Sequence, residues 1–148
     1  EQEDAGDFEG AIATYEKVYA QNSNNLIVAN NLASLLTSQR EDQASVERAF
    51  AIGLRLRGTQ IPAFQDTYGW IEYRRGNYDE ALANLEPAAQ ALTGDPMVQL
   101  HLGMTYAALK RTEEARTTLA RALEMAKDST LPAYEAARKT LADLGGAP

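Results

Sequence analysis

A single histidine and two pairs of neighbouring carboxylates are the side chains in this sequence best suited to chemistry. His101 is the only histidine and the chain has no cysteine, so a metal ion would lack its usual nitrogen and sulfur ligands. Leu100 and Leu102 flank His101, which predicts an ordinary histidine on a helix surface. The acidic pairs at 79–80 and 113–114 stand at the start of predicted helices, where they complement the helix dipole. We therefore predict no metal site and no catalytic site.

Motifs and composition narrow the class of protein further. The sequence has no phosphate-binding loop, no dinucleotide-binding glycine pattern and no nucleophile elbow. It also lacks a visible nucleophile–base set, so we predict a protein that is not an enzyme and uses no cofactor. The 148 residues carry a formal net charge of −7, which argues against nucleic-acid binding because such surfaces are basic. No apolar run reaches the roughly 18 residues that membrane insertion requires.

Helical patterns fill almost the whole chain. Apolar and small residues recur at intervals of three and four positions, as in amphipathic helices, and no segment shows the alternation of a strand. The expected helices are 8–21, 26–37, 44–56, 62–75, 78–92, 96–109, 112–126 and 131–144. Asp7, the polar run 22–25 and Asp95 are predicted to begin helices, and Asn77 with Glu80 has the spacing of a capping box.

Matching residues recur 34 positions apart. Gly69 recurs as Gly103 and Leu85 as Leu119, and the alanines at 81 and 88 return at 115 and 122. A fixed period of this length is typical of stacked helix–turn–helix repeats. We expect Gly69 and Gly103 to let the two helices of a repeat approach closely, and we expect each repeat to bury its apolar face by stacking.

These positions resemble the tetratricopeptide repeat (TPR), in which a Leu-Gly-x2-Tyr element precedes an Ala-x3-Phe element. The fullest match is Leu102-Gly103-x2-Tyr106 followed by Ala115-x3-Leu119. The resemblance implies an all-α fold, an α-solenoid of antiparallel helix pairs with about eight helices in a right-handed superhelix. The implied units are a truncated repeat, a degenerate repeat, two complete repeats and a C-terminal capping helix, at 1–25, 26–61, 62–95, 96–129 and 130–148. The segment 66–82 also looks like the C-terminal repeats of long bacterial TPR proteins.

In the TPR family the first helix of each repeat lines a concave groove, and the resemblance implies the same here. Projecting that face predicts these partner-binding residues: Asn30, Ser34, Asp66, Trp70, Tyr73, Arg74, Met97, Leu100 and Met104. Trp70 is either a binding hot spot or a side chain packed on a neighbouring helix. Met97, Leu100 and Met104 either contact a partner or lie beneath the next helix. Because Asp66 would repel a carboxylate, we do not expect a carboxylate clamp.

A second set of side chains leaves two interpretations open. The arginines concerned are Arg55, Arg57, Arg74 and Arg75. They form either a local basic patch or ordinary solvated charge near helix C-termini, where arginine complements the dipole.

The resemblance implies a non-enzymatic scaffold that binds a peptide or helix of a protein partner in the groove. The alternative is a structural spacer or oligomerisation segment of a larger bacterial TPR protein, with a link to envelope or polysaccharide export. A truncated first repeat would leave Phe8, Ile12, Tyr15 and Tyr19 partly uncovered, which predicts self-association through this end. We expect a soluble protein of the bacterial cytoplasm or periplasm, and the sequence does not distinguish the two.

Overall fold

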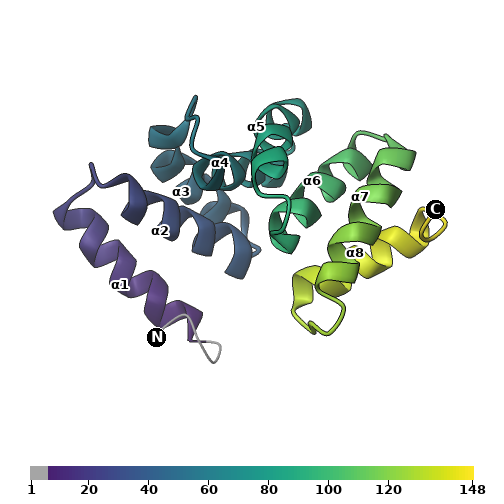
Figure 1. The fold of residues 1–148 in the computed structure, drawn as a ribbon. Helices are drawn as coiled ribbons and strands as arrows, with labels where there is room; N and C mark the ends of the chain where they lie inside the picture. The colour runs from purple at the N-terminus through teal and green to yellow at the C-terminus, as the bar shows by residue number, and fades with distance from the viewer. Residues whose placement is uncertain (1–6) are drawn as a thin grey trace.

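The computed structural model describes residues 7–148, and these residues form helices with no strand among them (Figure 1). The helices are α1 (Phe8–Gln21), α2 (Leu26–Gln39), α3 (Gln43–Gly53), α4 (Pro62–Arg74), α5 (Tyr78–Ala91), α6 (Pro96–Ala108), α7 (Thr112–Met125) and α8 (Pro132–Asp143). A single helix was expected over 44–56, but α3 ends at Gly53 and tightens into a short 3-10 turn, η1 (Leu54–Leu56). The prediction of an all-α fold with about eight helices is confirmed.

Successive helices pair and stack into an open, curved array (Figure 1). The most extensive contacts join α4 to α5 and α6 to α7, and α5 and α7 then pack on the helix that follows them. The first helices of neighbouring pairs also touch, because α2 contacts α4, α4 contacts α6 and α6 contacts α8. Within the described part of the chain, the backbones of α1, α3, α5 and α7 stay farther apart from one another, although Arg48 of α3 pairs with Glu16 of α1 at 2.8 Å. The first helices therefore lie on the inside of the curve, and we call the surface of α2, α4, α6 and α8 the inner wall.

Two glycines set the spacing inside the helix pairs. A Cβ atom added at Gly69 would lie 2.7 Å from Cγ of Leu85, and one added at Gly103 would lie 2.7 Å from Cδ2 of Leu119. Both distances are shorter than non-bonded carbon atoms tolerate, so a side chain at either position would push the two helices apart. The prediction that these glycines permit close approach is confirmed.

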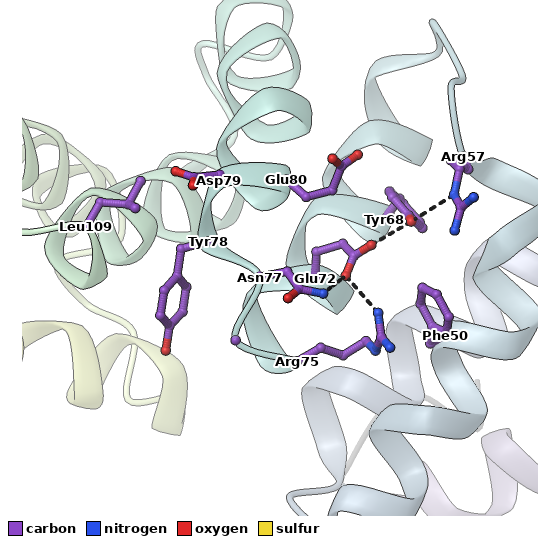
Figure 2. A pocket seen from close by; sticks show the side chains of 11 residues that line it. Phe50, Arg57, Tyr68, Glu72, Arg75, Asn77, Tyr78, Asp79, Glu80 and Leu109 are labelled. Atoms are coloured by element: carbon purple, nitrogen blue, oxygen red, sulfur yellow. Dashed lines mark hydrogen bonds and ion pairs between the residues drawn. The ribbon is translucent and has the colours of Figure 1, made fainter.

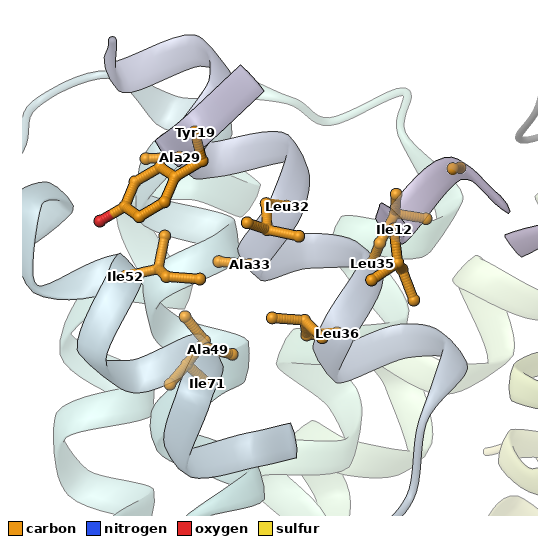
Figure 3. Close-up of a cluster of buried hydrophobic side chains, with 11 residues drawn as sticks. Ile12, Tyr19, Ala29, Leu32, Ala33, Leu35, Leu36, Ala49, Ile52 and Ile71 are labelled. Atoms are coloured by element: carbon orange, nitrogen blue, oxygen red, sulfur yellow. The ribbon is translucent and has the colours of Figure 1, made fainter. Parts of the chain in front are cut away.

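The N-terminal core is built from α1, α2, α3 and α4 (Figure 3). Ile12 and Tyr19 of α1 are buried there against neighbouring helices, and Leu32 and Leu36 of α2 lie at its centre. The expectation that Ile12 and Tyr19 are partly uncovered is therefore wrong. Phe8 and Tyr15 are half-buried and pack against the same core.

Side-chain caps mark several of the helix starts. The carboxylates of Asp7 and Asp95 and the amide oxygen of Asn25 each accept a hydrogen bond from a backbone N–H two or three residues later, at 3.0–3.2 Å for the shortest bond of each. These three predictions are confirmed. Asn77 does not cap α5 with its side chain. Its Nδ2 atom donates to Oε1 of Glu72 at 2.9 Å. The predicted capping box at this position is wrong.

Candidate functional site

The inner wall carries stacked rings where α4 meets α6. The Trp70 ring lies nearly parallel to Tyr73, with centroids 4.2 Å apart and an interplanar angle of 8°. It also lies nearly parallel to His101 of α6, with centroids 4.1 Å apart and an angle of 17°. Trp70 remains half-buried. Its ring therefore takes part in the packing of one repeat on the next while part of its surface still faces solvent.

His101 is fixed by a second contact in the same seam. Its Nδ1 atom lies 2.7 Å from Oδ1 of Asp66, on α4. His101 is only 8% exposed, so the prediction of a helix-surface histidine is wrong. The reason is that α6 has helices on several sides, and Trp70 covers the imidazole from the α4 side. The carboxylate of Asp66 is correspondingly engaged within the chain and is not a free charge on the wall.

The α2 part of the inner wall is more open. Ser34 and Ile27 are exposed, and Asn30 lies between them on the same helical face. The amide nitrogen of Asn30 donates to Oδ1 of Asn31 at 3.4 Å. The Oδ1 atom of Asn30 is buried and has no hydrogen-bond partner. Buried polar atoms in proteins are nearly always paired, so this acceptor is unusual.

Arg74 connects the inner wall to the end of α2. Its guanidinium donates to the backbone oxygen of Thr37 and, at 3.2 Å, to that of Arg40. Carbonyl groups at a helix C-terminus have no partner inside the helix, so a cation from the next repeat satisfies them well. Arg74 was predicted to face a partner, and the structure places its charged group against α2.

The other arginines considered from the sequence are also engaged by the chain itself. Arg75 lies over the ring of Phe50 at 3.5 Å and pairs with Glu47 and Glu72. Arg57 donates to the Tyr68 hydroxyl at 3.2 Å, and the Arg55 guanidinium lies 5.2 Å from the Tyr19 ring centroid. These contacts use the guanidinium groups in packing, which favours separate charges over one shared basic patch.

The apolar residues of α6 that the sequence analysis singled out, Met97, Leu100 and Met104, are covered to different extents by neighbouring helices. Leu100 is buried in a core cluster with Leu119 of α7 and Tyr134 of α8. Met97 and Met104 are half-buried against the same cluster. The end of the chain therefore covers much of this apolar surface, and the more open part of the wall lies on α2 and α4.

A cavity of about 760 Å³ opens where α4 turns into α5 (Figure 2). The residues that line it are Phe50, Arg57, Tyr68, Glu72, Arg75, Gly76, Asn77, Tyr78, Asp79, Glu80 and Leu109. On one side of it Glu72, only 4% exposed, accepts from the Tyr68 hydroxyl at 2.6 Å, from Nδ2 of Asn77 at 2.9 Å and from Arg75 at 3.1 Å. The sequence reasoning did not identify this network, although Tyr68 and Glu72 have the spacing of neighbours on a helix face.

The electrostatics of Glu72 follow from these contacts. Burial alone would raise the pKa of the Glu72 carboxyl, but the hydrogen bonds from Tyr68, Asn77 and Arg75 outweigh burial and hold the pKa below its usual value. Both carboxylate oxygens already have donors. The network therefore fixes the turn between α4 and α5 and already uses most of the acceptor positions of Glu72.

Two other kinds of functional feature are absent from residues 7–148. No group of three or more histidine and carboxylate side chains in this range could hold a metal ion. Among the described helices, none has the length and apolar character needed to cross a membrane.

A comparison of the sequence with models of protein families agrees with the paired helices described above. The tetratricopeptide repeat model matches residues 72–141. Residues 72–141 of this chain therefore carry tetratricopeptide repeats. The TPR fold supports a general role as a protein-interaction scaffold, and proteins of this family are typically not enzymes.

Solved structures resemble this chain over most of its length. TTC0263, a thermophilic TPR protein of Thermus thermophilus, is 23% identical with a TM-score of 0.66, and the match covers 95% of this chain and 76% of that one. MamA is 18% identical with a TM-score of 0.63, and the match covers 97% and 82% of the two chains. At these identities the likeness concerns the fold alone. A comparison with curated protein sequences finds no match.

Proposed function

We propose that the inner wall binds a peptide or helix of a protein partner along α2 and α4. The observation that carries this proposal is the buried Oδ1 atom of Asn30, which has no donor. A donor from a bound segment would satisfy it after a small side-chain movement. The exposed side chains of Ile27 and Ser34 on either side supply apolar and polar contact area.

The position of Trp70 supports the same surface. It stands on α4, the first helix next to α2 on the wall, and part of its indole remains accessible. Aromatic side chains that are held rigidly lose little entropy when a partner binds, which makes them effective anchors. The stacking of Trp70 on Tyr73 and His101 supplies that rigidity.

The test is selection from a random peptide library, followed by binding measurements with two matched variants. Ser34→Arg places a long charged side chain on the inner wall at an exposed position, and Ala51→Arg does the same on α3, outside the wall. We expect selected peptides to lose at least tenfold in affinity with Ser34→Arg and to keep it with Ala51→Arg. Both variants should melt at the temperature of the parent protein, since neither site is buried.

A spacer or oligomerisation segment is the second candidate, and one observation favours it. Trp70 already packs on α6, and Leu100 is buried, so part of the predicted groove holds repeats together. Under this alternative, Trp70→Ala lowers the melting temperature and no selected peptide responds to Ser34→Arg. That combination of results would remove the case for peptide binding on the wall.

A further inference from the structure

Exposed apolar side chains gather at two corners of the solenoid. Of the seven large hydrophobic side chains exposed among residues 7–148, five lie where α1 passes into α2 and where α3 passes into α4. These are Val18, Leu26, Ile27, Leu54 and Ile61. We call these five residues, with the neighbouring cations Lys17 and Arg55, the N-terminal edge.

The two corners adjoin in space. The turn η1 contacts α2, and the Arg55 guanidinium reaches the ring of Tyr19 at the end of α1. The two helices that begin at these corners, α2 and α4, also pack on each other. Grouped apolar side chains of this kind mark interaction surfaces more often than scattered ones do.

The charge of the N-terminal edge is opposite to that of the whole protein. The segments 17–27 and 54–61 contain no aspartate or glutamate, although the chain carries a formal net charge of −7. Lys17 and Arg55 are exposed there, and neither forms an ion pair within residues 7–148. The starts of α2 and α4 add partial positive charge, and no side chain caps α4.

The other two corners of the same kind lack this combination. The α5–α6 corner carries Asp95 and has no large exposed hydrophobic side chain. The α7–α8 corner exposes Met125 and Leu131, but it also carries the exposed acids Glu124 and Asp128. The N-terminal edge is therefore distinguished from comparable surfaces in the chain by both its apolar content and its charge.

We propose that the N-terminal edge is a second docking surface, which binds an acidic amphipathic helix of a protein partner. This surface goes beyond the inner-wall function. It shares Ile27 with the contact area proposed there, and Ser34→Arg distinguishes the two because Ser34 lies outside the N-terminal edge. Leu54 and Ile61 contact the apolar face of the partner helix, while Lys17 and Arg55 attract its carboxylates and select against basic segments. A membrane fits less well, since lipid-binding surfaces collect about four to eight basic residues.

The test uses a synthetic helical peptide with leucine on one face and glutamate on the other, titrated into the isotope-labelled protein. We expect amide shift changes confined to 17–27 and 54–61. The variant Leu54→Ser with Ile61→Ser should weaken binding at least tenfold, and Lys17→Glu with Arg55→Glu should do the same. Met125→Ser with Leu131→Ser is the matched control, because Leu131 (52%) is exposed to the same extent as Ile61 (50%).

Four results would overturn the proposal. The first is no binding of the leucine–glutamate peptide, or equal binding of a leucine–lysine counterpart. The second is shift changes restricted to the inner wall, which Ser34→Arg would then abolish. The third is binding to phosphatidylglycerol vesicles without binding to the peptide. The fourth is a sedimentation mass of two chains that returns to one chain in Leu54→Ser with Ile61→Ser, which would assign the surface to self-association.

Discussion

The Nδ1 atom of His101 and the Oδ1 atom of Asp66 lie 2.7 Å apart and join the first helices of two successive pairs. His101→Ala removes this bond and also one of the rings stacked on Trp70. We expect a loss of about 1–3 kcal/mol in the free energy of unfolding, because a partly buried carboxylate is left without its partner. Since Trp70 is the only tryptophan, its fluorescence should shift to the red as water reaches the indole.

A conservative variant separates the two contributions at this seam. His101→Phe keeps a ring against Trp70 and removes only the contact with Asp66. Its fluorescence should stay near that of the parent, while its stability falls between those of the parent and His101→Ala. Equal stability of all three proteins would show that the seam contributes nothing to folding.

Gly103→Ala tests the close approach of α6 and α7. The added methyl group would lie 2.7 Å from Cδ2 and 2.8 Å from Cγ of Leu119. We expect destabilisation of about 1–3 kcal/mol from overpacking, measured by denaturant unfolding. Gly94→Ala is the control, because no heavy atom lies within 4 Å of a Cβ atom at that position. Combining Gly103→Ala with Leu119→Ala should cost less than the sum of the single changes, since the second change removes the clash.

Glu72→Gln tests the pH dependence of the turn between α4 and α5. The pKa of Glu72 is lower in the folded protein than its usual value, so its charge stabilises the fold above about pH 4.3. This contribution is lost as the pH falls through the lowered pKa. The stability difference between the parent and Glu72→Gln should therefore be largest near pH 7 and shrink toward pH 3. A difference that stays constant over this range would contradict the assignment.

Arg74→Ala tests whether one repeat caps the helix of its neighbour. Its guanidinium bonds to the backbone oxygens of Thr37 and Arg40 at the end of α2. We expect a loss of about 1.5–3 kcal/mol, because hydrogen bonds from a charged donor are stronger than neutral ones. Hydrogen exchange should increase at the end of α2 and in the turn that follows it. Unchanged exchange there, with lower overall stability, would indicate a packing role for Arg74.

The features predicted correctly are those that the sequence encodes locally or repeats. Gly69 and Gly103 recur at the period of the fold, and each faces a leucine of its own helix pair. His101 was predicted wrongly because its partner Asp66 is 35 residues away, on a neighbouring pair. The sequence pattern within one repeat does not specify which side chain of the neighbouring repeat will face a given residue such as His101. Asn77 failed for a different, local reason, since its amide group donates to Glu72, five residues earlier.

The same limit applies to the candidate site. Projection of one helix face predicted Ser34 and Trp70, both of which keep accessible surface. It could not predict that the charged end of Arg74 reaches α2 or that Leu100 is buried beneath α8, because both depend on how far neighbouring helices overlap. The N-terminal edge was also missed, since it combines two corners that are separated in the chain.

Among the described residues, the backbones of the first helices pack on one another, whereas those of α1, α3, α5 and α7 stay farther apart, and this difference has a mechanical consequence. When such a solenoid flexes, the outer row can spread or close while the inner row acts as the pivot. Small changes in the angle between successive helix pairs then add up along the array. An array built in this way can change its curvature without unfolding any helix.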